Sequence, residues 1–298
     1  MALPKYLAII NPAAKSGKIV GLLPEIKQKL GELDVTYRET SRAGEAVDFA
    51  TNSADYDVVI AIGGDGTVHE IANGIMQLAE KDRPGVAVIP CGSGNDTCRM
   101  IGSPLEIGPA IESIKRAQMR PFDLGVCNGS YFVNSFSVGI DALTVAKTTQ
   151  IKRETSRSGM MLYGQALIDI ILNEMKPNNI TVTVDGKVFG RQVLLHAITN
   201  GQTYGSGFKI NPTACAEDGT LTSSYIEWMG RMRVLGYIPR LLRGTHTQID
   251  KYHTQEITSC TITSQDDTFL IAQADGELIE KERTFSIEVR PHALRFVV

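Results

Sequence analysis

Two short aliphatic runs, each followed by a cluster of glycines, constrain the fold of this chain most. Val58–Ile62 leads into Gly63-Gly64-Asp65-Gly66-Thr67, and Val86–Ile89 leads through Pro90-Cys91 into Gly92-Ser93-Gly94. Apolar residues recur at helical spacing after the first cluster, and a short helix is predicted after the second. Short strands that alternate with helices are typical of a mostly parallel sheet covered by helices.

The same alternation extends from residue 6 to about residue 120. Tyr6–Ile10 is predicted as a buried strand and Val35–Glu39 as a weaker one. Between them Leu23, Ile26 and Leu30 lie at helical spacing, with Pro24 near the helix start. We therefore predict that residues 1–123 form an α/β domain, a mostly parallel sheet with flanking helices.

After residue 123 the pattern changes to hairpins. Asn128-Gly129 separates two strand-like runs, which is a strong signal for a two-residue hairpin, and Asp218-Gly219 and Asp275-Gly276 punctuate further runs. Met160–Met175 is the one long helical stretch that we predict there. Residues 124–289 are thus expected to form an all-β, sandwich-like domain, and residues 290–298 a strand that can return to the first domain.

Composition excludes several classes of protein. The 298 residues include 30 basic and 33 acidic side chains, so a net charge of −3 gives no reason to expect nucleic acid as a partner. The five cysteines never show Cys-x-x-Cys spacing, which argues against a zinc site or a disulfide framework. Neither a signal peptide nor a run of about 20 apolar residues is found. We expect a cytoplasmic protein that meets membranes only at their surface.

The first glycine cluster has the features of an anion-binding loop. Glycines before a helix allow backbone N–H groups to approach a phosphate closely, and the helix dipole favours negative charge there. Thr67 and Glu70, three residues apart, match a capping box at the helix start. A tight turn without a ligand is the alternative, and phosphate binding is the favoured interpretation.

Two further loops repeat this arrangement. Gly92–Gly94 is followed by Asn95 and Asp96, either of which is predicted to cap the next helix, and Tyr6–Ile10 leads into a loop that begins at Asn11. Because ligands usually bind where the strands of an open α/β sheet end, the three loops are expected to share one cleft.

Standard nucleotide-binding motifs are absent from these loops. A P-loop would need a glycine at Pro12 and a serine or threonine at Ile19. A dinucleotide fingerprint would need a third glycine at His69 or Thr97. Neither a Gly-x-Ser-x-Gly elbow nor a His-Glu-x-x-His zinc helix occurs.

The two glycine motifs, in this order, resemble the catalytic domain of the diacylglycerol kinase family, which includes sphingosine and ceramide kinases and bacterial lipid kinases. The resemblance rests on Gly63–Thr67 with Glu70 and Asn73-Gly74, and on Gly92–Asp96 with Arg99. Asn134–Asp141 is similar to the first segment of the family's second domain. The Asp-Gly pairs at 218 and 275 fall where the family has two further motifs. The resemblance covers nearly the whole chain and implies a nucleotide-binding domain, residues 1–123, followed by a lipid-substrate domain, residues 124–289.

The resemblance also implies roles for individual residues. Asp65 would act through Mg²⁺ on the phosphates of ATP, and Glu277, with Asp275 close by, would take the proton from the lipid hydroxyl. By itself Asp275-Gly276 is typical of a hairpin turn. Further contacts to ATP would come from Asn11, Thr40, Gly63, Gly64, Gly66, Thr67, Glu70, Gly92, Ser93, Asn95 and Asp96.

A structural Mg²⁺ of some bacterial members would map to Cys215, Asp218 and the carbonyl of Thr220. This sequence departs from the family at three points: Cys215 replaces the usual serine, Ser93 replaces a frequent threonine but keeps the hydroxyl, and the loop from Asn11 to Lys18 lacks the commoner Asn-Pro-x-Ser-Gly form.

The resemblance makes diacylglycerol the expected acceptor, phosphorylated to phosphatidic acid. A sphingoid base or phosphatidylglycerol is an alternative acceptor, and a nucleotide-sensing lipid-binding protein without turnover is an alternative of another class. NAD kinases share the Gly-Gly-Asp-Gly-Thr loop, but this chain has no segment like their Gly-Ser-Thr-Ala.

Two segments of the second domain bear on a lipid partner. Met160–Met175 is typical of a buried helix, and its alternative role is to wall an acyl-chain pocket. Trp228–Arg243 contains four arginines and no acidic residue, which is typical of a solvated face or of weak contact with an anionic membrane. We expect transient contact with a membrane surface and leave a homodimer open.

Overall fold

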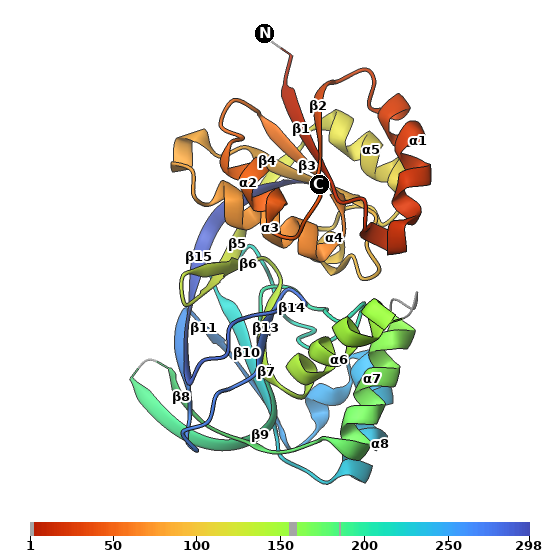
Figure 1. The fold of residues 1–298 in the computed structure, drawn as a ribbon. Helices are drawn as coiled ribbons and strands as arrows, with labels where there is room; N and C mark the ends of the chain where they lie inside the picture. Colours follow the sequence, from red (N-terminus) through yellow and green to blue (C-terminus); the bar gives the residue numbers. More distant parts are fainter. Residues whose placement is uncertain (1–2, 155–159, 185) are drawn as a thin grey trace.

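The computed structural model describes residues 3–154, 160–184 and 186–298. Two domains lie one above the other in the view of Figure 1, with the chain's beginning and end both in the upper one. The predicted fold class is confirmed: an α/β domain is followed by a sandwich-like domain of mainly antiparallel strands.

The first domain is built on four parallel strands in the order β2-β1-β3-β4. Its strands are β1 (Lys5–Ile10), β2 (Asp34–Glu39), β3 (Val58–Gly63) and β4 (Gly85–Pro90). Its helices are α1 (Leu23–Lys29), α2 (Glu45–Thr51), α3 (Asp65–Ile75), α4 (Asp96–Ile101) and α5 (Ile107–Arg116).

Helices on both faces explain why the central strands are apolar throughout. Every residue of β3 and β4 is buried, as expected for a parallel sheet that is covered on both sides. One apolar core lies between the sheet and α2 and α3, and a second lies between the sheet and α1 and α5. β3 and β4 can therefore contribute polar groups to a site through the loops at their ends and not along their length.

In the part of the second domain that the structure describes there are eleven strands and three α-helices. Its first strands are β5 (Met119–Cys127), β6 (Ser130–Phe132), β7 (Ser135–Gly139), β8 (Asn178–Val184), β9 (Lys187–Thr199) and β10 (Leu221–Glu227). The later ones are β11 (Tyr252–Ile257), β12 (Ser259–Ser264), β13 (Ala272–Ala274), β14 (Glu277–Leu278) and β15 (Thr284–Val297). The helices are α6 (Ile140–Glu154), α7 (Met160–Asn173) and α8 (Arg231–Arg243). The sequence patterns predicted α7 but neither α6 nor α8.

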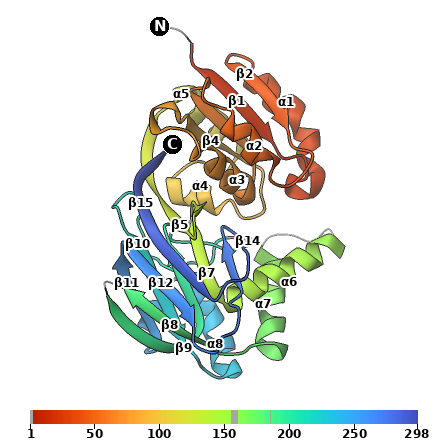
Figure 2. The ribbon, with the colours of Figure 1, turned by 60° about the vertical axis from the view of Figure 1, so that its left-hand side comes forward.

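Two long strands join the domains into one continuous sheet. β5 and β15 pair antiparallel along most of their length, and Phe296 at the end of β15 lies opposite Val86 of β4. Figure 2 shows β15 rising from the lower domain to the edge of the upper sheet. The chain's last residues thus pack in the cores of the first domain, with Leu294 and Phe296 in one and Val297 in the other.

No helix among the residues described is both long enough and apolar enough to cross a membrane.

Candidate active site

A cleft of about 1040 Å³ lies between the two domains. One wall consists of the loops that follow β1, β3 and β4, together with residues 40–43 after β2. The other wall comes from the start of β7, from α6 and α7, from residues 204–206 and from the turn between β13 and β14. The three loops that the sequence placed at strand ends therefore do share one cleft.

The two glycine loops touch each other through their backbones. β3 and β4 are parallel neighbours, and the Cys91 N–H donates to the Gly63 carbonyl at 2.8 Å. A Cβ on Gly64 would lie 2.8 Å from the Gly92 Cα, and a Cβ on Gly92 would lie 2.5 Å from the Gly64 Cα. No real Cβ packs so closely against a backbone, so this contact requires glycine on both sides.

The helices after these loops are capped differently from the prediction. α3 starts at Asp65 without a side-chain cap, so Thr67 lies within its first turn and the capping box with Glu70 does not form. The Glu70 carboxylate instead accepts the N–H groups of Gly44 (2.9 Å) and Ala46 (3.2 Å) at the start of α2. The predicted capping box was wrong because the Glu70 carboxylate caps the start of α2, which lies more than twenty residues earlier in the sequence, and not its own helix.

α4 also begins without a cap from its own segment. Neither Asn95 nor Asp96 caps it, and Asn95 has a left-handed φ of 54°. The Thr97 N–H donates to Asp65 Oδ1 at 2.9 Å, so the carboxylate that follows β3 supports the helix that follows β4. This bond ties the two glycine loops together a second time.

Asp65 and Asp96 bring two carboxylates to the same point of the cleft. A Cβ on Gly94 would lie 2.9 Å from Asp65 Oδ2 and 3.3 Å from Asp96 Oδ2. Burial and the neighbouring Asp65 charge raise the pKa of Asp96 to about 6, although the Ser206 N–H donates to it at 2.8 Å. Paired carboxylates of this kind are the oxygen ligands that Mg²⁺ prefers.

Asn11 and Thr40 shape the neighbouring loops. Asn11 Nδ2 donates to Thr67 Oγ1 at 3.3 Å, and Asn11 Oδ1 accepts the Ala13 N–H at 3.0 Å. The Thr40 N–H and hydroxyl both donate to the Ile10 carbonyl, at 2.9 and 3.3 Å. Both side chains line the cleft while holding its first-domain wall in shape.

The turn that carries Glu277 projects from the second domain toward the first glycine loop. Asp275 and Gly276 have φ values of 51° and 85°, as a tight hairpin turn between β13 and β14 requires. Glu277 Oε1 would lie 2.9 Å from a Cβ on Gly66. An exposed glutamate of one domain thus lies against the first glycine loop of the other.

The Asp275 carboxylate, by contrast, is buried and fully bonded. The backbone N–H groups of Val133, Asn134 and Ser135 donate to it at 2.7, 2.8 and 3.0 Å, and His69 Nδ1 lies 2.8 Å away. Only 2% of the Asp275 side chain is exposed. These contacts fix the position of the turn that carries Glu277.

Helix α3 attaches the first glycine loop to the second domain. Burial lowers the pKa of His69, but the hydrogen bond and charge of Asp275 outweigh burial, so the net shift is upward. One turn further along, Asn73 Nδ2 donates to the Tyr131 carbonyl at 2.8 Å, and the Tyr131 N–H donates to Asn73 Oδ1 at 2.9 Å. The helix that begins at Asp65 is therefore held against the domain that carries Glu277.

Most of the predicted site residues line the cleft. They are Asn11, Thr40, Gly64, Asp65, Gly66, Thr67, Glu70, Gly92, Ser93, Asp96, Asp275 and Glu277. Gly63 and Asn95 support the loops from behind. A Cβ on Gly63 would lie 2.3 Å from Thr67 Oγ1, and the Asn95 side chain accepts the Gly92 N–H at 3.0 Å.

Sequence reasoning missed much of the second-domain wall, and it missed two cations that line the cleft, Lys15 and Arg42. The missed residues of the second domain include Val145, Thr148, Tyr163, Tyr204, Ser206 and Gln273. Only the Tyr204–Gly207 segment carried a signal, because its two glycines mark a tight loop.

Comparison with known proteins decides the family. Residues 5–127 match the diacylglycerol kinase catalytic domain, and residues 134–298 match the YegS C-terminal NAD kinase beta sandwich-like domain. A diacylglycerol kinase of Staphylococcus saprophyticus is 32% identical over 281 residues, which are 90% of this chain and 87% of that protein. The chain belongs to the diacylglycerol kinase family. The predicted family is thus confirmed, and with it the class of enzyme, an ATP-dependent lipid kinase.

Solved structures of two other proteins share the fold of this diacylglycerol kinase family member over nearly its whole length. A Bacillus anthracis protein, provisionally described as a diacylglycerol kinase, has a TM-score of 0.83 at 25% identity, covering 100% of this chain and 96% of that one. An NAD kinase from Archaeoglobus fulgidus, solved in complex with ATP, has a TM-score of 0.58 at 13% identity, covering 98% of this chain and 93% of that one. The NAD kinase shares the fold alone.

The residues predicted to bind a structural Mg²⁺ in this diacylglycerol kinase family member lie outside the cleft. Asp218 Oδ1 accepts both the N–H and the hydroxyl of Thr220 at 2.9 Å, and Cys215 is exposed. Within the described ranges no group of three His, Cys, Asp or Glu side chains could hold a metal ion. A thiol is a soft ligand that fits Mg²⁺ poorly. This metal site stays a prediction, and we derive no step from it.

Proposed function

We propose that this protein transfers the γ-phosphate of ATP to the hydroxyl of diacylglycerol and so forms phosphatidic acid. The observation that carries the proposal is the position of Glu277 Oε1 against Gly66, in a cleft that also contains both glycine loops. Relatives named diacylglycerol kinase support the choice of acceptor.

The first-domain wall fits the phosphates of ATP. Backbone N–H groups at a helix N-terminus bind phosphate, and Lys15 and Arg42 add positive charge to the same wall. Asp65 and Asp96 are the residues that we propose to hold Mg²⁺, because their carboxylates meet beside Gly94. A bound Mg²⁺ would neutralise the phosphate oxygens as charge develops on them.

Glu277 is the proposed general base. Its carboxylate would accept the proton of the lipid hydroxyl while the hydroxyl oxygen bonds to the γ-phosphorus and ADP leaves. Asp275 is proposed as a positioning residue, because its oxygens already accept three backbone N–H groups and contact His69. A lipid-binding protein without turnover would have no use for a carboxylate placed against the anion-binding loop.

The second-domain wall favours an uncharged acceptor. Apart from Asp275 and Glu277, the cleft-lining residues of that domain carry no charge, and the lining cations Lys15 and Arg42 belong to the first domain. Phosphatidylglycerol would bring a phosphate to a wall that lacks a cation among the described residues, whereas diacylglycerol brings none. We also propose that the enzyme is cytoplasmic and meets its lipid at the membrane surface.

Glu277→Gln tests the proposal. The glutamine keeps size and hydrogen bonding but cannot accept the proton, so kcat should fall about 10²–10⁴-fold. The dissociation constant of ATP, measured by calorimetry, should change little, because the glycine loops belong to the other domain. Phosphate transfer is measured with radiolabelled ATP on diacylglycerol, a sphingoid base and phosphatidylglycerol.

Three results would contradict the proposal. Full turnover in Glu277→Gln would place the base elsewhere, and lost ATP binding would make Glu277 a nucleotide residue. A wild-type preference for one of the other two lipids would overturn the choice of acceptor.

A further inference from the structure

Helix α7 has an apolar outer stripe that the fold leaves exposed. Met161, Ile168 and Leu172 are 86%, 44% and 48% exposed, and their spacing places them within about 20° of one direction around the helix. The exposed Gln165 is the polar residue that lies among them. The opposite face packs into an apolar core through Leu167, Ile170 and Ile171. A helix on a soluble surface normally turns polar residues outward, so this stripe points to a partner.

Helix α8 adds positive charge and a further apolar side chain. Met232 is 79% exposed, and four of the thirteen residues of α8 are arginines with no acidic residue among them. Arg233 pairs with Asp250 at 3.1 Å. The other three, Arg231, Arg240 and Arg243, form no ion pair with any acidic side chain that the structure describes.

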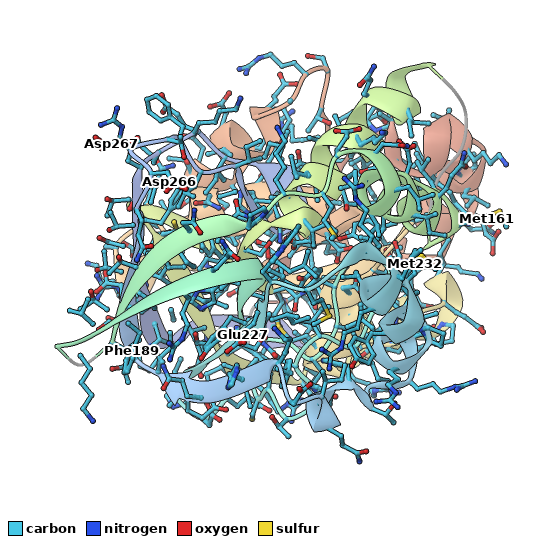
Figure 3. The ribbon with its side chains drawn as sticks, turned by 90° about the horizontal axis from the view of Figure 1, so that it is seen from below. Met161, Phe189, Glu227, Met232, Asp266 and Asp267 are labelled. Atoms are coloured by element: carbon cyan, nitrogen blue, oxygen red, sulfur yellow. The ribbon has the colours of Figure 1, made fainter. Side chains whose placement is uncertain are left out.

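The two helices face the same side of the molecule. Both contribute to the apolar core that covers β9 and β10, so their outer faces point away from the sheet together. Figure 3 shows Met161 and Met232 on the side of the helices, with Phe189 and Asp267 on the opposite side. α7 also carries Tyr163, which lines the cleft and lies on the face of the helix roughly opposite to Met161, so one helix forms part of the cleft wall and also presents the exposed stripe.

We propose that the outer faces of α7 and α8 dock on an anionic membrane surface and bring the cleft to the bilayer. Methionine and aliphatic side chains enter the interfacial layer, and unpaired arginines bind lipid phosphates while their stems lie along the apolar boundary. The combination of an apolar stripe with unpaired positive charge matches such a membrane better than a neutral protein surface. The proposal rests on the proposed function, which gives the enzyme an acceptor that resides in a membrane.

The experiment measures binding to vesicles by sedimentation. One set contains phosphatidylcholine alone, and in the other phosphatidylglycerol replaces about a third of it, enough to create a negative surface potential. Wild type should bind the anionic set, and salt should weaken the binding. Arg240→Gln/Arg243→Gln should bind about 25-fold more weakly, because each arginine should contribute about fivefold. Met161→Ser/Met232→Ser should bind about tenfold more weakly.

Matched controls change the same residue types elsewhere. Arg38→Gln/Arg116→Gln removes two exposed arginines from the first domain. Val188→Ser/Phe189→Ser removes two exposed apolar side chains of β9, of which Phe189 lies on the side opposite to the helices in Figure 3. Both control variants should bind vesicles like the wild type. The proposal is overturned if the wild type binds neither set, if it binds both sets equally, or if the control variants weaken as much as the α7 and α8 variants.

A second readout separates this proposal from the proposed function. All variants should phosphorylate a short-chain, water-soluble diacylglycerol at the wild-type rate, because none of the changed residues lies in the cleft. The α7 and α8 variants should lose rate only on diacylglycerol embedded in anionic vesicles. A wild type that binds these vesicles but phosphorylates no diacylglycerol would refute the acceptor and leave the docking face standing. Variants that lose rate equally on both substrates would refute the docking role.

Discussion

The two walls of the cleft are built in different ways. The first-domain wall consists of loops that each follow directly on a strand, so Gly63–Thr67 and Gly92–Asp96 are continuous segments. The second-domain wall is assembled from single residues and short segments between residues 134 and 277. A local sequence can specify the first kind of wall, whereas the second kind depends on contacts between distant segments.

The two walls are also held in place by different interactions. In the first wall the two glycine loops pack backbone against backbone, which leaves no room for adjustment at Gly64 and Gly92. In the second wall one buried carboxylate, Asp275, gathers residues 133–135 and His69 and so sets the position of Glu277. The first wall therefore has the rigid backbone that the proposed phosphate site needs, and the second holds the proposed base in place.

Asp65→Asn tests the first wall and has the largest expected effect. Asparagine keeps the oxygen that accepts the Thr97 N–H, so the fold and both glycine loops should persist. The loss of one negative charge beside the proposed Mg²⁺ should reduce kcat on the order of a thousandfold. The assay is diacylglycerol phosphorylation, with circular dichroism and the melting temperature as controls for folding. Turnover like that of the wild type in a folded variant would remove Asp65 from the site.

Asp275→Asn and His69→Ala test the second wall from its two sides. The N–H groups of residues 133–135 donate to both carboxylate oxygens of Asp275, and asparagine keeps only one of these acceptors. Asp275→Asn should therefore lower the free energy of unfolding by about 2–4 kcal/mol. His69→Ala removes only the contact from α3 and should cost about 1–2 kcal/mol.

Urea denaturation compares the two variants. kcat should fall about tenfold or more in Asp275→Asn, since a small displacement of a base has a large effect on rate. Equal losses of stability and rate in both variants would mean that the contact with His69, and not the bonds to residues 133–135, positions the turn.

Asp141→Asn tests a buried charge that lies behind the second wall, where it accepts a hydrogen bond from the cleft-lining Gln273, and its effect depends on pH. Burial raises the pKa of Asp141 from 3.8 to about 6, although Ser137, Gln273 and the Ala142 N–H donate to it. The folded protein therefore binds this proton more tightly than the unfolded chain does. Asp141 accordingly lowers stability as the pH rises from about 4 to about 6.

The expected result is that the difference in unfolding free energy between the wild type and Asp141→Asn changes with pH. Between pH 4 and pH 7 the wild type should lose about 2–3 kcal/mol of unfolding free energy relative to Asp141→Asn. Urea denaturation at several pH values measures this difference, with the exposed Asp266→Asn as the control. A difference that is independent of pH would show that Asp141 ionises in the fold as readily as in the unfolded chain.

Some features of the site were open to prediction and others were not. Glycine spacing and apolar periodicity are local properties, so they indicated β3, β4 and the loops that follow them. Thr67 and Glu70 have the spacing of a capping box, but Glu70 caps α2 because the fold brings that helix to it. Asp275 and Glu277 are two residues apart in the sequence, which does not separate their proposed roles. The structure does so, because the Asp275 carboxylate is buried and Glu277 is exposed.

The sequence by itself determined the alternation of strands and helices, the two glycine loops and, through its motifs, the family. These follow from side-chain volume, backbone freedom and the order of residues along a few turns of chain. Only the tertiary structure decided that Glu277 lies against Gly66, that Asp65 supports α4, and that β4 is the strand with which the returning end of β15 pairs. Each of these contacts joins residues separated by tens to hundreds of positions. Such contacts form only because folding buries the apolar faces between them, and no local pattern records that burial.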